Sequence, residues 1–302
     1  MGGPARAERC DEAQRASAKL PAKIVRTAYR NITKFLESNT FLAQARMLKL
    51  KQTAYLDREL FEGIEACRLH WQKNFRNKDF LTREEQIKNF AIEFAFNTTS
   101  IEGNTITFEE AAKLLAEQIT PKNRTLREVY DIQNTERVFL SLTKKTVEIN
   151  QESIIALHSE LMKEIDVRIG YRTGNVRVMH SHFEATPAPY VKTDIDLLLK
   201  WYAKHKSLLH PFILASIFHH KFEKIHPFFD GNGRTGRMLM NAILLNAAHP
   251  PFIVRKKNRP MYLEVLSKAD KADLTETPAS VYKPLTNFLA REYTMTYWNS
   301  FL

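Results

Sequence analysis

The segment that most constrains this chain runs from residue 226 to residue 237 and reads His-Pro-Phe-Phe-Asp-Gly-Asn-Gly-Arg-Thr-Gly-Arg. Three of the nine glycines of the chain fall in it, beside a histidine, a carboxylate, an amide and two arginines. Such a segment is poor core material, and apolar residues then recur at helical spacing: Met238, Leu239, Ala242, Ile243, Leu245 and Ala248. The pattern therefore predicts a polar loop whose end opens a helix.

A loop of this kind presents unpaired backbone N–H groups and the positive end of a helix dipole, which together favour a phosphate group. Gly231 and Gly233 allow the backbone to approach a ligand closely and to adopt positive φ. Arg234 and Arg237 lie three residues apart, and each guanidinium can bind a phosphate through two N–H groups. The loop is therefore predicted to bind phosphate.

Three other side chains of the segment add chemistry to this site. Asp230 would repel phosphate by itself, so its presence predicts a magnesium ion between the carboxylate and the phosphates. Asn232 adds a neutral donor, and His226 can accept a proton near neutral pH. The segment predicts a general base, a metal carboxylate and a phosphate-binding loop.

These residues match the signature of the Fic (filamentation induced by cAMP) family, His-x-Phe-x-(Asp/Glu)-Gly-Asn-Gly-Arg-x-x-Arg, at every specified position. An ordinary glycine turn before a helix would need all of these positions to coincide by chance. The resemblance extends over about residues 80 to 292. It implies an all-α fold, a Fic-type helical bundle with a short β-hairpin flap near the active site.

The resemblance also implies a reaction, the transfer of AMP from ATP to a Tyr, Thr or Ser hydroxyl of a target protein. His226 would be the catalytic base and Asp230 the magnesium ligand. The resemblance assigns nucleotide and phosphate binding to Gly231, Asn232, Gly233, Arg234, Gly236, Arg237 and Tyr262. Arg234 would bind the β-phosphate and Arg237 the γ-phosphate, whereas core packing is the alternative role of Tyr262.

A second, shorter motif lies far upstream. Thr98, Glu102 and Gly103 match the family's inhibitory pattern, (Ser/Thr)-x-x-x-Glu-(Gly/Asn). A lone glutamate at a helix C-terminus is unfavourable, so we expect it to pair with Arg237, where it would take the place of the γ-phosphate. The motif predicts autoinhibition. In the alternative interpretation, Glu102 only solvates a helix end.

The segment from about 172 to 190 contains alternating β-branched residues between glycine and proline, which predicts a short hairpin. In Fic proteins the corresponding flap pairs with the target by strand addition. The resemblance assigns this docking to Val176, Arg177, Val178, Met179 and His180. His180 and His182 lack a third ligand in the sequence, so they do not predict a metal site.

The rest of the chain is predicted to be helical. Residues 1–20 are polar and aperiodic, which predicts disorder. Residues 21–80 are predicted to form a helical extension packed on the core. Residues 81–302 are predicted to form the Fic domain, with the inhibitory helix at about 83–102. Periodicity and caps predict helices at about 22–37, 41–52, 56–76, 83–101, 108–119, 126–144, 151–165, 193–208, 211–225, from 259 on, and 279–298.

Composition narrows the class of protein. A 302-residue chain with 44% hydrophobic residues can bury a large core. Two cysteines are too few for a disulfide framework, and no 18-residue apolar run is present, so we expect a cytoplasmic protein without membrane contact. The net charge of +11 leaves a basic nucleic-acid-binding helical protein as the non-enzymatic alternative, but no zinc-finger or RNA-recognition signature supports a nucleic-acid partner.

Several chemical alternatives stay open within the family resemblance. Glu102 would also suit the removal of AMP from a modified protein, by aligning a water molecule. Transfer of UMP or phosphocholine is compatible with a loop that binds phosphates. Relatives that phosphorylate a target depart from Gly-Asn-Gly-Arg, which this chain keeps. The target protein is unidentified, and self-modification and a homodimer are open.

Overall fold

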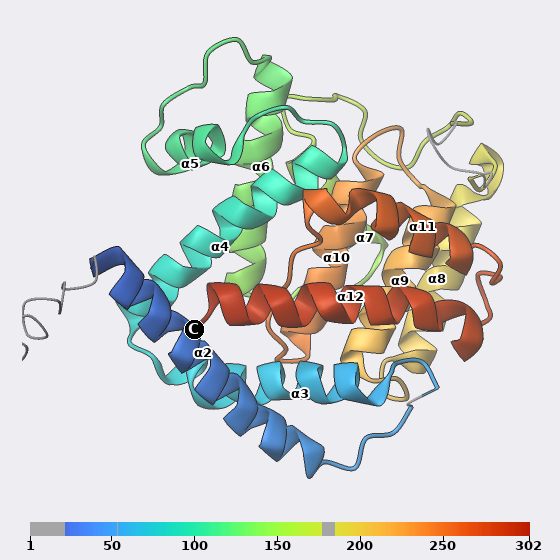
Figure 1. Cartoon of the computed structure of the whole chain (residues 1–302). Coiled ribbons are helices and arrows are strands. Elements are labelled where there is room, and N and C mark those ends of the chain that lie inside the picture. Colours follow the sequence, from blue (N-terminus) through green and yellow to red (C-terminus); the bar gives the residue numbers. More distant parts are fainter. Residues whose placement is uncertain (1–21, 53, 177–184) are drawn as a thin grey trace, which may run out of the picture. The chain divides into compact units, whose positions relative to one another are not determined.

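The structure, a computed structural model, describes residues 22–52, 54–176 and 185–302 (Figure 1). The described residues divide into two compact units, with the boundary between Thr40 and Phe41. The predicted disorder of residues 1–20 lies outside the described residues. Residues 41–80, predicted to be an extension, belong to the same compact unit as the rest of the chain up to its C-terminus.

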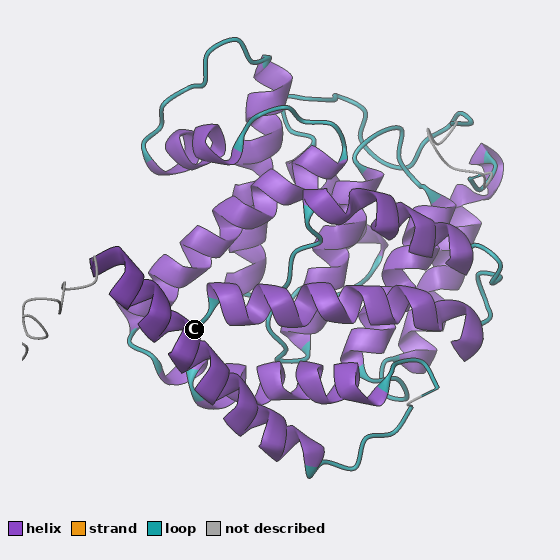
Figure 2. Cartoon of the chain, viewed as in Figure 1, coloured by secondary structure: helices purple, strands orange, loops and turns teal. Residues whose placement is uncertain are grey.

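Helices joined by loops make up the described residues, and no strand occurs among them (Figure 2). The α-helices are α2 Ala22–Arg46, α3 Arg58–Lys73, α4 Phe80–Ile101, α5 Phe108–Ala116, α6 Leu126–Lys144, α7 Gln151–Leu161, α8 Val191–His205, α9 Pro211–Ile225, α10 Asn232–Asn246, α11 Arg259–Ala269 and α12 Ala279–Ser300. Short 3-10 helices are η1 Phe75–Asn77, η2 Ala188–Tyr190 and η3 Lys256–Asn258. The all-α prediction is confirmed.

Two predicted helices, 22–37 and 41–52, are wrong, because α2 is one helix that runs from Ala22 to Arg46. The residues predicted to break it are Ser38, Asn39 and Thr40. Their side chains donate hydrogen bonds to carbonyl groups one turn back, two to Phe35 and one to Leu36, at 2.8–3.1 Å. Polar side chains that bond to their own helix are compatible with its continuation.

Capping explains where several helices begin. Thr107 and Thr125 each accept a backbone N–H three residues on, and Glu110 and Glu128 bond back to the cap residues, which confirms both predicted capping boxes. α4 begins three residues earlier than predicted, since the Asp79 side chain accepts the N–H of its third residue.

The centre of the larger unit is the pair α9 and α10, which pack against each other (Figure 1). Every residue of α10 from 232 to 244 is buried, and so is most of α9. Helices buried all round are fixed by packing on several sides. The predicted active-site loop joins these two helices, so both of its ends are anchored in the core.

The predicted hairpin is not found in the part of its segment that the structure describes. Residues 170–176 and 185–187 contain no strand, and residues 177–184 lie outside the described residues. Strand pairing by the flap therefore stays a prediction. No helix in the described ranges is both long and apolar enough to span a bilayer.

A buried side chain of α10 tests the importance of this central pair. Leu244 is 0% exposed, so Leu244→Ala should lower the free energy of unfolding by about 2–5 kcal/mol, because it removes apolar contacts and leaves a cavity. Leu208→Ala is the control, since that side chain is 60% exposed. Urea unfolding measures both, and an equal effect of the two substitutions would contradict the central role of α10.

Candidate active site

His226 ends α9 in a left-handed backbone conformation, with φ of 53°. Its Nδ1 lies 3.3 Å from the carbonyl oxygen of Glu223. Because a carbonyl only accepts, Nδ1 donates this bond, and the neutral ring keeps its lone pair on Nε2. Burial lowers the pKa of His226, against the effect of the Glu223 carbonyl, which raises it. His226 is therefore held as a neutral base near pH 7.

Arg172 holds the backbone of His226 in place, and sequence reasoning missed it. Its Nε donates to the carbonyl of His226 at 2.7 Å, and its backbone N–H donates to the carbonyl of Pro227 at 2.9 Å. The same guanidinium donates to the carbonyls of Gly174 and Thr186. A buried Arg172 thus ties both described ends of the flap segment to the start of the loop. No sequence motif marks this role.

Asn232 closes the loop on itself. Its side-chain oxygen accepts the N–H of Phe228 at 2.8 Å, and its nitrogen donates to the carbonyl of the same residue at 2.9 Å. Gly231 is the residue before α10, and its backbone has a φ of 75°. It has no side chain that could cap the helix. The side-chain amide of Asn232 therefore fixes the shape of the loop. No side chain caps the N–H groups in the first turn of α10. Contact between Asn232 and a phosphate stays a prediction.

Asp230, the predicted magnesium ligand, lies at the rim of the loop with 39% of its side chain exposed. One carboxylate oxygen accepts the N–H of Gly231 at 2.6 Å, and the other pairs with Arg127 of α6. Arg234 lies 3.4 Å from the first oxygen. Arg127 is a further residue that the sequence did not single out, since it lies about a hundred positions upstream.

Arg234 is buried and forms an ion pair with Asp131 of α6. Its side chain is 2% exposed, and burial lowers its pKa to about 10, which keeps it charged. Asp131 was not predicted. A buried arginine without a carboxylate would be strongly destabilised, so Asp131 stabilises the loop's first arginine in the absence of phosphate.

Arg237 connects the loop to the predicted inhibitory motif. Its Nη2 lies 2.7 Å from Oε1 of Glu102, its Nε donates to Oγ1 of Thr98 at 2.7 Å, and Nη2 also donates to the Thr98 carbonyl. The predicted pair of Glu102 with Arg237 is therefore formed, across 135 positions of sequence. Burial acts to lower the pKa of Arg237, but the Glu102 carboxylate outweighs it and the pKa is raised.

Gly233 shows where the Glu102 carboxylate lies. A Cβ atom at Gly233 would collide with Oε1 of Glu102 and would lie 2.9 Å from Nη1 of Arg237. The carboxylate therefore sits over the first turn of α10, where that helix would attract an anion. Burial acts to raise the pKa of Glu102, but Arg237, Arg234 and His226 outweigh it and lower the pKa.

Comparison with known proteins agrees with this geometry. Residues 148–244 match the family model described as the Fic/DOC family. This chain contains a Fic/DOC domain. The match includes the loop, α9 and most of α10, and so most of the residues described above.

Similar proteins extend the likeness beyond the Fic domain. The chain is 29% identical over 264 residues to Protein adenylyltransferase Fic of Nematostella vectensis, covering 85% of this chain and 58% of the relative. It is 30% identical over 246 residues to Protein adenylyltransferase Fic of Drosophila ananassae, covering 78% and 46%. The chain thus spans about half the length of these curated relatives.

A solved structure shows the same fold. A Fic-domain-containing signaling protein from Bacteroides thetaiotaomicron superposes with a TM-score of 0.71 and 21% sequence identity, covering 78% of this chain and 95% of that one. At this identity the likeness concerns the fold alone. It supports the helical Fic architecture described here.

A buried polar network lies behind the Fic loop. The side chains of Glu223 and His219 approach to 3.8 Å beside Gly236, and a Cβ there would collide with Glu223. Burial raises the pKa of Glu223 to about 8 and lowers that of His219 to about 3, so both are uncharged at pH 7. Glycine is therefore required at position 236 for close packing, and the network adds no second charge next to Arg237.

Tyr262 is a core residue of the larger unit. Its side chain is 1% exposed, its hydroxyl hydrogen-bonds to Nε2 of His219, and its ring stacks near Phe288. The alternative role, packing, is therefore the one that its surroundings favour. Contact with an adenine ring stays a prediction that requires the ring to be uncovered.

Of the predicted flap-docking residues, Val176 alone is described, and it is not in a strand. Arg177, Val178, Met179 and His180 lie outside the described residues. Their pairing with a target stays a prediction.

Glu65, His210 and His249 form a second cluster with metal-ligand side chains, within 4.8 Å of one another. Nδ1 of His210 accepts the N–H of Phe212, so its Nε2 carries the proton and donates to Glu65 at 3.0 Å. Arg68 occupies the same carboxylate. A metal-bound histidine would need its other nitrogen to donate, so the cluster is a structural hydrogen-bond network.

The ion pair between Glu102 and Arg237 gives a testable pH dependence. The pKa of Glu102 is lowered on folding, so its stabilisation is present above the unfolded pKa and is lost as pH falls through the folded value. Because the Glu102 side chain is 39% exposed and solvent screens the pair, Glu102→Gln should lower the free energy of unfolding at pH 7 by at most about 1 kcal/mol, and by less at pH 3. Urea unfolding of both proteins at the two pH values measures this, and a difference that grows in acid would contradict the pairing.

Proposed function

We propose that this chain is a protein adenylyltransferase that transfers AMP from ATP to a Tyr, Thr or Ser hydroxyl of a target protein, and that Glu102 inhibits it. One observation carries the proposal: a neutral His226, with Nδ1 bound to the Glu223 carbonyl, stands at the entrance of a loop that leads into the uncapped N-terminus of α10. The names of the relatives from Nematostella vectensis and Drosophila ananassae support the same reaction.

In the proposed reaction, the target hydroxyl oxygen forms a bond to the α-phosphorus of ATP. The bond from the α-phosphorus to the oxygen that bridges to the β-phosphorus breaks, and pyrophosphate leaves. Nε2 of His226 accepts the hydroxyl proton. The N–H groups at the start of α10 stabilise negative charge on the phosphates, and Arg237 binds the γ-phosphate once Glu102 has left. Catalysis is thus positioning, charge stabilisation and one proton transfer.

The residues present fit a magnesium ion. Asp230 offers a carboxylate that is 39% exposed at the edge of the loop, and magnesium in ATP sites is usually held by one or two carboxylates plus phosphate oxygens. Arg127, which pairs with Asp230 in this structure, would have to release it. Bound there, the ion would neutralise charge on the phosphates.

Inhibition follows from the place of the Glu102 carboxylate. It is bonded to Arg237 and lies over Gly233, so a γ-phosphate cannot use the same guanidinium and the same helix turn. ATP that binds beside it would have its phosphates displaced, and the hydroxyl would lack an in-line path to the α-phosphorus. The proposed wild-type enzyme is therefore nearly silent.

Removal of AMP from a modified protein is the second candidate. The side chain of Glu102 is 39% exposed beside the loop, so its carboxylate can also accept a proton from water. Incubation of an AMP-modified protein with the wild-type chain distinguishes the two reactions, because only hydrolysis releases AMP without ATP.

The role of His226 predicts a clear separation of chemistry from binding. His226→Ala should abolish AMP transfer in an activated Glu102→Gly background, while ATP binding stays within about threefold, because the phosphate-binding groups are unchanged. Transfer of label from α-³²P-ATP to protein and calorimetric ATP binding measure the two effects. His205→Ala is a control outside the loop, and retained transfer in His226→Ala would refute the assignment.

Release of inhibition is the other prediction. Glu102→Gly should raise self-modification and target labelling at least about tenfold, equivalent to roughly 1.4 kcal/mol of barrier. Glu117→Gly is the matched control, since Glu117 also ends a helix, α5, but has no contact with Arg237 in the structure. Equal rates for wild type and Glu102→Gly at saturating ATP would mean that Glu102 does not inhibit.

A further inference from the structure

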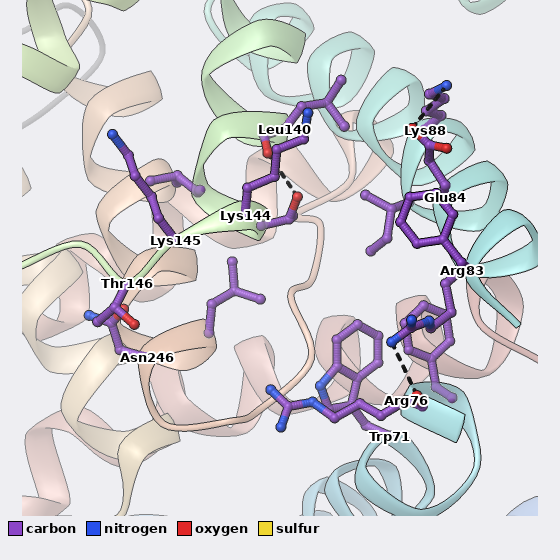
Figure 3. A pocket seen from close by; sticks show the side chains of 16 residues that line it. Trp71, Arg76, Arg83, Glu84, Lys88, Leu140, Lys144, Lys145, Thr146 and Asn246 are labelled. Carbon is purple, nitrogen blue, oxygen red and sulfur yellow. Dashed lines mark hydrogen bonds and ion pairs between the residues drawn. The ribbon is translucent and has the colours of Figure 1, made fainter. Parts of the chain in front are cut away.

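A groove of about 740 Å³ lies among the ends of several helices (Figure 3). Its walls come from the end of α3, η1, the first half of α4, the end of α6 with the residues that follow it, and the end of α10. No residue of the loop 226–237 lines it. Its volume is in the range of small-molecule sites, and the proposed transferase reaction leaves it unused.

The floor of the groove is apolar. Trp71 and Phe75 stack on each other with ring centroids 4.1 Å apart, and Ile87 and Leu140 lie beside them half-buried. Phe80, at the edge, is 67% exposed. Large apolar side chains that face water next to a concave apolar surface mark a place where an apolar ligand gains by burial.

The rim of the groove is cationic. Five of its residues are cations and one is a carboxylate, Glu84, which already pairs with Lys88 at 3.4 Å. Figure 3 shows Arg76 and Arg83 on one wall and Lys144 on another. The lining residues therefore carry a net charge of +4 (five cations less one carboxylate), of which Glu136, outside the lining but near Lys88 and Lys144, offsets a part.

Arg83 distinguishes this rim from an ordinary basic surface. It is the fourth residue of α4, where a cation adds to the positive end of the helix dipole and is unfavourable. One of its nitrogens donates to the carbonyl of Arg76 at 3.1 Å, but its Nε is buried without a hydrogen-bond partner in the described structure. Protein atoms cover that nitrogen, so a ligand in the groove would meet the rest of the Arg83 guanidinium, which lines the groove and adds to its positive charge.

The wall formed by the ends of α6 and α10 also affects the charge of the groove. α6 ends at Lys144 and α10 at Asn246, so two helix C-termini place partial negative charge near the groove. Lys144 and Lys145 offset that charge, which is a common arrangement at helix ends. The lining keeps a net positive charge after these contributions, which suits an anionic head group.

We propose that the groove binds a long-chain carboxylate, with its hydrocarbon chain on the apolar floor and its carboxylate among the cations of the rim. Arginine and lysine bind carboxylates through charge-assisted hydrogen bonds, which suits a groove lined by five cations. This ligand site is independent of the proposed transfer of AMP.

The first test uses sodium dodecanoate, below its micelle concentration, with the intact chain in isothermal titration calorimetry. Dodecanoate should bind with one-to-one stoichiometry. Octanoate should bind at least tenfold more weakly, because it has four fewer methylene groups to bury. Dodecyltrimethylammonium, which has the same chain length and the opposite charge, should not bind. Absence of dodecanoate binding, or equal binding of the cationic detergent, would overturn the proposal.

The second test locates the site with two variants of equal charge change. Lys145→Glu, in the groove, should weaken dodecanoate binding at least fivefold, whereas Lys204→Glu, exposed on α8, should stay within twofold of wild type. Urea unfolding checks that both variants fold. Equal effects of the two variants would place the ligand elsewhere. The proposal would also be overturned if Lys145→Glu disrupted a dimer of this chain. The same holds if an acidic Glu/Leu peptide bound in place of dodecanoate and Lys145→Glu weakened its binding, since the groove would then accommodate polypeptide.

Discussion

The short loop between two buried helices is the constraint on which the site depends. α9 and α10 are held by packing on nearly all sides, so the chain between Ile225 and Asn232 has few conformations open to it. His226 in a left-handed conformation and Gly231 at positive φ make the two bends. The side chain of Asn232 hydrogen-bonds to the backbone of Phe228, between the two bends, and Arg172 donates to the carbonyl of His226, at the first bend. A base and a helix N-terminus are thereby brought to one place before any substrate binds.

Charge balance inside the protein decides the resting state of this site. Two arginines face a place that would hold phosphates, and each has a carboxylate partner when phosphates are absent, Asp131 for Arg234 and Glu102 for Arg237. The two partners differ in one important respect. Asp131 is mostly buried on the rigid α6, whereas the side chain of Glu102 is 39% exposed at the end of α4. Glu102 is thus the partner that can leave with less disturbance of the core.

The groove in another part of the larger unit has, like the Fic loop, cationic side chains beside helix ends. Helix ends gather there, and their dipoles and basic side chains create a field that no carboxylate of the lining cancels fully. In the Fic loop a glutamate of the same chain supplies the anion, whereas the cations that line the groove outnumber its one carboxylate by four. This difference is why an external ligand is proposed for the groove.

The sequence by itself determined the helical class, the bounds of α6 and α9, both capping boxes, the loop that opens α10, and the pairing of Glu102 with Arg237. These features depend on short-range periodicity, on caps within three residues, or on a motif with many specified positions. Where local signals were ambiguous the prediction was wrong, as in α2, because polar residues that break a helix can also bond back to it. Only the tertiary structure decided the partners Asp131, Arg127 and Arg172 and the burial of Tyr262. Each of these joins positions that lie tens to more than a hundred residues apart, and such contacts depend on how whole helices pack.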